Sequence, residues 1–124
     1  MERPVTPDVL QDRIRKALAL EGAHSWESVK DRLRSGRAQM FWNDHGAWIT
    51  EVVDAPLKRS LNCWVVAGEL PGVMDLQADV LAHAREQGCA DLTATARFGW
   101  KHVAREYGWK EKAMLIHREV PHAA

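Results

Sequence analysis

Residues 61–109 read LNCWVVAGELPGVMDLQADVLAHAREQGCADLTATARFGWKHVAREYGW, and this stretch decides the fold. Its opening run, Leu61–Gly68, is apolar and too short for an isolated helix, which favours a buried strand. Apolar residues then recur at spacings of three and four, which indicates one face of a helix that ends at Gly88. That face comprises Val73, Leu76, Val80, Leu81 and Ala84. Asp91–Ala96 is short and carries threonines, so the order strand, helix, strand predicts a right-handed parallel βαβ unit.

The same periodicities predict the core of this unit. Alternate residues of a strand share one face, and helix residues three or four apart share another. We therefore expect Trp64 and Val66 of the strand to be buried against Leu76 and Val80 of the helix.

The composition is that of one folded domain. The chain has 124 residues, of which 46% are hydrophobic and six are tryptophan, so we expect a single domain spanning residues 1–124. The 17 basic and 17 acidic residues cancel, which gives no basic field for nucleic acid. We expect no membrane association and a cytoplasmic location, because no apolar run is long enough to span a bilayer and the N-terminus does not resemble a secretory signal.

Two helices are expected before the sheet. Thr6 is a suitable N-cap and Pro7 suits a first helical position, so the first helix begins here and ends at Gly22. Ser25 can cap the second helix, which ends at Gly36.

A β-hairpin follows these helices. Its strands are Ala38–Trp42 and Ala47–Val53, and the turn formers at 43–46 join them. The strand that begins at Leu61 is then expected to pair antiparallel with this hairpin.

The hairpin also suggests a contact surface. It displays Phe41, Trp42 and Trp48, and aromatic side chains beside charges serve as anchors in protein interfaces. We expect the hairpin face, centred on Phe41 or Trp42, to contact another protein or a second copy of the chain. The alternative is that the two N-terminal helices cover these rings.

The chain is expected to end with a helix and a strand. The short helix runs from Trp100 to Glu106. The strand is Lys112–Val120, where apolar residues fall on both faces.

The cysteines and histidines do not form a recognisable chemical motif. Cys63 and Cys89 lack the C-x-x-C spacing and are expected to be structural thiols of a reducing compartment. No two histidines have the spacing of a helical zinc site, so we expect no metal centre.

The predicted order of elements resembles that of the GNAT (N-acetyltransferase) superfamily without its usual first strand. The closer resemblance is to small GNAT-like proteins encoded by tailed phages and prophages, and it covers about Pro7 to Val120. The stretches that carry it are Arg34–Phe41, Trp48–Val52, Leu61–Leu70, Ala84–Cys89, Ala96–Trp100 and Tyr107–Trp109. The resemblance implies an α/β fold with a central mixed sheet, an N-terminal antiparallel hairpin, a parallel βαβ unit and helices on both faces.

The resemblance also implies a cofactor site for acetyl-CoA where the parallel strands part. In the family the pyrophosphate binds backbone N–H groups of a glycine-rich loop at a helix N-terminus. The matching positions here include Ala67, Gly68 and Gly72, but the glycine spacing differs and Glu69 would repel a phosphate. A tight turn between strand and helix is therefore an alternative interpretation of this loop.

A second anion site is expected at the start of the short helix. Arg97, Trp100 and Lys101 could hold the 3′-phosphate of the cofactor with two cations and free N–H groups. Alternatively, the tryptophan closes the end of the core between two solvated charges.

The catalytic residues implied by the resemblance are only partly present. Glu51 lies within a strand and is the candidate general base, although an exposed edge glutamate is the alternative. The family's catalytic tyrosine corresponds to Ala104.

Two functions remain open at this stage. One is an acyl-CoA-dependent N-acyltransferase with an atypical cofactor loop. The other is a non-catalytic phage protein that keeps the fold as a binding module, for example in virion assembly, and is then located in a bacterial host or a virion. Fold alone does not decide between them.

Overall fold

The computed structural model describes residues 7–21, 23–95 and 100–121. The chain divides into two compact units, with the boundary between Ala94 and Thr95. Of the helices that the structure describes, none is long and apolar enough to cross a membrane.

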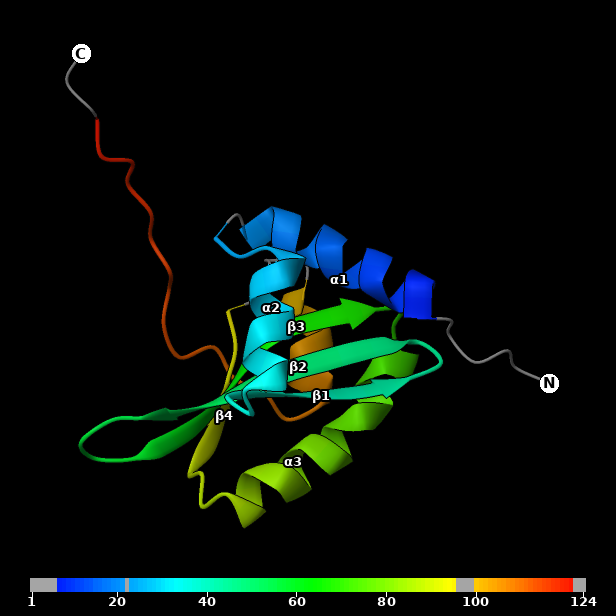
Figure 1. The fold of residues 1–124 in the computed structure, drawn as a ribbon. Helices are drawn as coiled ribbons and strands as arrows, with labels where there is room; N and C mark the ends of the chain where they lie inside the picture. Colours follow the sequence, from blue (N-terminus) through cyan, green and yellow to red (C-terminus); the bar gives the residue numbers. More distant parts are fainter. Residues whose placement is uncertain (1–6, 22, 96–99, 122–124) are drawn as a thin grey trace. The chain divides into compact units, whose positions relative to one another are not determined.

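The first unit is built on a four-stranded mixed sheet (Figure 1). Its strands lie in the order β1-β2-β3-β4. They comprise β1 (Ala38–Asn43), β2 (Gly46–Asp54), β3 (Arg59–Gly68) and β4 (Asp91–Thr93). The first three pair antiparallel and β3 pairs parallel with β4, which confirms the predicted hairpin and the βαβ unit. The second strand of that unit is shorter than expected, because β4 ends at Thr93.

Helices lie on both faces of this sheet (Figure 1). On one face lie α1 (Pro7–Glu21) and α2 (Trp26–Arg34). On the other lie the 3₁₀ helix η1 (Gly72–Leu76) and α3 (Gln77–Glu86). Ser25 caps α2 as predicted, in a reciprocal capping box with Ser28. The predicted cap at Thr6 and the predicted stop at Gly22 lie outside the described residues.

The core between the sheet and the first two helices is apolar. It comprises Leu10, Ile14, Leu18, Trp26, Val29, Ala38, Ala47, Ile49, Val65 and Ala67. Because both helices present a stripe of large apolar side chains to one sheet face, this core fixes their position on the sheet.

The opposite face has its own buried residues. Val73, Leu76 and Val80 are buried there, and the Trp48 indole Nε1 donates a hydrogen bond of 2.8 Å to the carbonyl oxygen of Val73. The prediction for Leu76 and Val80 is therefore confirmed. Leu81, which the spacing assigns to the same helix face, is 43% exposed.

A β-bulge changes the face on which Trp64 lies. Ile49 pairs with Val65, but the next residue of β2, Thr50, pairs with Cys63, so Trp64 is the extra residue of β3. Its side chain packs, half-buried, against the core under α1 and α2. The sequence pattern predicts that Trp64 and Val66 lie buried against the η1–α3 segment. This prediction is wrong for Trp64, because the alternation of side chains fails at a bulge. Val66 is only half-buried.

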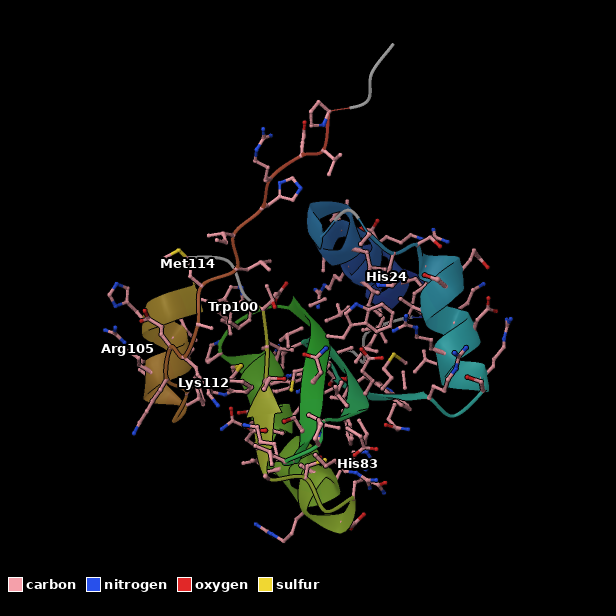
Figure 2. The ribbon with its side chains drawn as sticks, turned by 90° about the vertical axis from the view of Figure 1, so that its left-hand side faces the viewer. His24, His83, Trp100, Arg105, Lys112 and Met114 are labelled. Atoms are coloured by element: carbon pink, nitrogen blue, oxygen red, sulfur yellow. The ribbon has the colours of Figure 1, made fainter. Side chains whose placement is uncertain are left out.

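The second unit contains the helix α4 (Lys101–Glu106), which begins one residue later than predicted. The predicted strand Lys112–Val120 is wrong, since this segment has no regular secondary structure and every residue in it is exposed. Figure 2 labels Lys112 and Met114 in this segment. Apolar side chains on both faces are typical of a buried strand, but a strand also needs a hydrogen-bonding neighbour. No other described residue of this unit forms one.

Candidate functional site

The site begins where the two parallel strands part. β3 and β4 pair only at Ser60–Asp91, Leu61–Leu92 and Asn62–Thr93. Beyond Asn62, β3 continues to Gly68, and no described strand continues beside it on that side. Every second residue of a strand directs its N–H and C=O groups towards the same neighbour. The Cys63–Gly68 part of β3 therefore offers a backbone edge on the side opposite β2.

A row of polar side chains crosses the sheet at this point. Glu51 of β2 pairs with Asn62 of β3, and Asn62 pairs with Thr93 of β4. The Thr93 hydroxyl donates a hydrogen bond of 3.3 Å to the side-chain oxygen of Asn62. Directly opposed residues share a sheet face, so this polar row of Glu51, Asn62 and Thr93 lies on the face that α1 and α2 cover.

Three further side chains surround Glu51 and the bulge. Arg32 Nη1 of α2 donates a hydrogen bond of 2.9 Å to Glu51 Oε2. The same guanidinium carbon lies 4.6 Å from the ring centroid of Trp64. His24, between α1 and α2, contacts the same ring edge-on with centroids 4.6 Å apart (Figure 2). We call Arg32, Glu51, Trp64 and His24 the cation cluster.

The cation cluster is partly open to water. Glu51 is 23% exposed and Arg32 is 30% exposed, and Glu51 is the least exposed carboxylate among the ion pairs of the described residues. A carboxylate in this setting can accept a proton or bind a cation. The sequence-predicted Glu51 is thus close to the parted strands. Sequence reasoning missed Arg32, Asn62 and Thr93. The available signal was Asn62, a polar residue within the apolar strand that begins at Leu61.

The predicted phosphate loop packs against the β1–β2 turn. A Cβ atom at Gly68 would overlap the carbonyl oxygen of His45, and Gly68 has a φ of +145°, a conformation that favours glycine. A Cβ atom at Gly72 would overlap the His45 ring. Both glycines therefore allow the turn to approach closely. Ala67 is buried in the core under α1 and α2.

Several donors of this loop already have partners. The Glu69 N–H donates to the carbonyl oxygen of His45 at 2.9 Å, and the Val73 N–H donates to that of Glu69 at 2.9 Å. Arg13 donates to the carbonyl oxygen of His45 at 2.6 Å and to the Glu69 carboxylate at 3.0 Å. These bonds hold the loop, the turn and α1 together.

The remaining predicted site residues, Arg97, Trp100 and Lys101, all belong to the second unit. Arg97 lies outside the described residues, and the side chain of Lys101 is not described. Trp100 is half-buried and occupies the N-cap position of α4 (Figure 2).

Cys63, which precedes the bulged residue Trp64 in β3, has a buried thiol. Burial raises the pKa of Cys63 to about 12, so this thiol stays protonated and is a poor nucleophile at neutral pH. Cys89 is half-buried, and burial raises its pKa as well. Among the residues that the structure describes, no group of three or more histidine, cysteine, aspartate or glutamate side chains could hold a metal ion.

Comparison with solved structures shows which fold this is. A Trypanosoma brucei acetyltransferase superposes with a TM-score of 0.67 and 11% identity, covering 95% of this chain and 97% of that one. An aminoglycoside acetyltransferase from an uncultured soil metagenomic sample, solved with sisomicin, superposes with a TM-score of 0.66 and 15% identity, covering 94% and 90%. The chain has a GNAT-like fold.

A third structure supports the same assignment. A protein described as a "probable acetyltransferase" superposes with a TM-score of 0.66 and 15% identity, covering 98% of this chain and 97% of that one. No protein-family model and no curated protein matches the sequence. At these identities, the likeness establishes the GNAT-like fold and leaves the activity to be argued from the site.

Proposed function

We propose that this GNAT-like protein transfers an acyl group from an acyl-CoA to an amine. The observation that carries the proposal is the parting of β3 and β4 beside the polar row that contains Glu51. The acetyltransferases with the same fold support this reaction class, and the aminoglycoside enzyme among them supports an amine as acceptor.

The residues of the first unit fit part of such a cofactor. The backbone edge of Cys63–Gly68 can exchange hydrogen bonds with the amide groups in the arm of an acyl-CoA. The bound acyl-CoA would supply the activated carbonyl carbon that the amine attacks. Glu51 would accept the proton that the amine loses, and N–H groups at the parted strands would stabilise the developing oxyanion. As the new C–N bond forms, the thioester C–S bond would break, and CoA would leave as a thiolate that takes its proton from water.

Phosphate binding would be atypical. Ala67, Gly68 and Gly72 are the proposed loop positions, yet both glycines accommodate the β1–β2 turn and several loop donors are used. We propose Arg97 and Lys101, the cations that precede and follow Trp100 in the sequence, as the residues that contact the phosphates.

Binding and turnover test this proposal together. Acetyl-CoA should raise the melting temperature, because a ligand that binds the native state stabilises it. Transfer of the acetyl group to a panel of amines, followed by mass spectrometry, should yield the amide. Glu51→Gln should lower kcat by about 10²–10⁴-fold, whereas the exposed control Glu27→Gln should not. No stabilisation and no product at millimolar acetyl-CoA would rule out the acyltransferase.

Two observations favour a second candidate, a non-catalytic binding module. The tight packing of Gly68 and Gly72 against His45 gives the loop a structural role, and the position of the family's catalytic tyrosine holds Ala104. This module would use the hairpin face centred on Phe41 or Trp42 as its contact surface, and the exposure of Trp42 favours the face on which Trp42 lies. Co-purification of a defined partner that Trp42→Ala abolishes, without acetyl-CoA binding, would favour it.

A further inference from the structure

The cation cluster combines two surfaces that recognise organic cations. Glu51 supplies a carboxylate, and Trp64 supplies an aromatic face, which attracts a cation through its quadrupole. The Arg32 guanidinium contacts both at once, at 2.9 Å from the carboxylate and 4.6 Å from the ring centroid. The cluster therefore already holds a cation, supplied by the protein itself.

The position of the cluster connects it to the proposed reaction. Glu51 pairs with Asn62, the last residue of β3 that pairs with β4, and Trp64 is the bulged residue two positions further along β3. An ammonium group between Glu51 and Trp64 would thus lie at the point where the strands part.

Exchange of the cation is feasible because the pair is not sealed. Both side chains retain contact with water, so Arg32 can leave without stranding a buried charge. Partly exposed ion pairs contribute little net stability, so an entering ammonium competes against a weak contact.

We propose that Glu51 and Trp64 form a binding clamp for an aliphatic primary ammonium ion, and that Arg32 occupies this clamp until the ammonium displaces it. The assignment of this ammonium as the acyl acceptor rests on the proposed function. Arg32 is then a specificity-determining residue, because only a ligand that replaces both of its contacts displaces it at low cost.

Amine binding without any acyl-CoA tests the clamp. The probe is n-butylammonium, with n-butanol as the uncharged control, and the readout is the NMR signal of the Trp64 indole N–H, identified by its loss in Trp64→Leu. n-Butylammonium should shift this signal in the wild-type chain and n-butanol should not. Equal responses to both probes, or no response to the amine, would overturn the clamp.

Variants of Arg32 separate displacement from simple binding. Arg32→Met removes the competing charge but keeps an extended side chain, and it should tighten n-butylammonium binding about fivefold. Arg32→Lys retains a competitor and should stay near the wild-type affinity. Arg34→Met is the matched control, since Arg34 lies on the same helix and its ion pair is with Asp31, three residues earlier in that helix. Weaker binding in Arg32→Met would refute the displacement.

Two results distinguish the clamp from the proposed reaction. If the Arg32 and Trp64 variants change amine binding as expected but no acyl transfer occurs, the clamp is supported and the acyltransferase proposal is ruled out. If acyl transfer occurs with kinetic constants that Trp64→Leu does not change, the acyltransferase is supported and the clamp is ruled out. Binding of n-butylammonium to the wild-type chain tests the clamp even if Arg32→Met does not fold.

Discussion

At the scale of single residues, Leu76 tests the core beneath the sheet. It is buried at the end of η1, so Leu76→Ala should lower the free energy of unfolding by about 2–5 kcal/mol in denaturant titrations. Leu81→Ala is the matched control, because Leu81 is exposed on the next helix and should cost about 1 kcal/mol or less. A cost below about half a kcal/mol for Leu76→Ala would place this side chain in solvent.

Cys63 gives a second residue-scale prediction, on pH dependence. Burial raises the pKa of its thiol from 9.0 to about 12, so above pH 9 the unfolded chain loses a proton that the folded chain keeps. The contribution of this group to stability is therefore complete below pH 9 and is lost as the pH rises towards 12. The slope is at most about 1.4 kcal/mol per pH unit.

The measurement is the free energy of unfolding across this alkaline range. Wild type should lose stability more steeply with pH than Cys63→Ala, whose unfolding no longer involves this proton. Cys89→Ala serves as the control with the less buried thiol. Parallel pH profiles for wild type and Cys63→Ala would show that the Cys63 thiol is accessible in the folded chain.

At the scale of elements, the β1–β2 turn and the loop before η1 form one packed unit. Gly72→Ala should destabilise the protein by about 1–3 kcal/mol, because the added methyl group overlaps the His45 ring. The same change should cost less in a His45→Ala background, which a double-mutant cycle measures. Gly68→Ala is the control. Its cost in stability should be the same in the His45→Ala background, because a methyl group at Gly68 meets the backbone of His45, which that change keeps. Additive effects of Gly72→Ala and His45→Ala would contradict this packing.

The segment 112–120 gives a further prediction at this scale. Leu115 is 77% exposed, so Leu115→Ser should change the free energy of unfolding by less than about 0.5 kcal/mol. Val65→Ser, in the buried strand β3, is the comparison that should be severely destabilising. A loss of several kcal/mol in Leu115→Ser would mean that this segment is a packed strand, as its sequence pattern suggested.

At the scale of the whole molecule, Trp42 decides the proposed hairpin interface. Trp48 is buried on the sheet face that η1 covers, where its indole N–H donates a hydrogen bond to Val73, and Trp42 is 61% exposed, so the two N-terminal helices bury neither ring. Trp42→Ala should therefore leave the stability nearly unchanged while removing any self-association. Light scattering over a range of concentrations should show an oligomer for the wild type and a monomer for the variant. A wild-type monomer at every concentration would rule out a second copy of the chain as the partner.

Much of the candidate site lies beyond sequence reasoning. Glu51 could be singled out because it is a carboxylate inside a strand. Its partner Arg32 could not, because it lies on a helix whose position over the sheet depends on packing. The role of Gly68 and Gly72 could not be predicted either. The pair is typical of a phosphate loop, but both glycines leave room for the β1–β2 turn, which is far away in the sequence.

The sequence by itself determined the elements whose signals are local. Strand and helix periodicities, the Ser25 cap and the turn at 43–46 gave the order of elements, the hairpin and the parallel unit of the GNAT-like fold. Only the tertiary structure decided what depends on distant partners. The bulge at Trp64 follows from the register between β2 and β3, and the exposed segment 112–120 has no strand beside it in the described part of its unit. Periodicity specifies which side chains share a face, but pairing and register are set by the neighbouring strand.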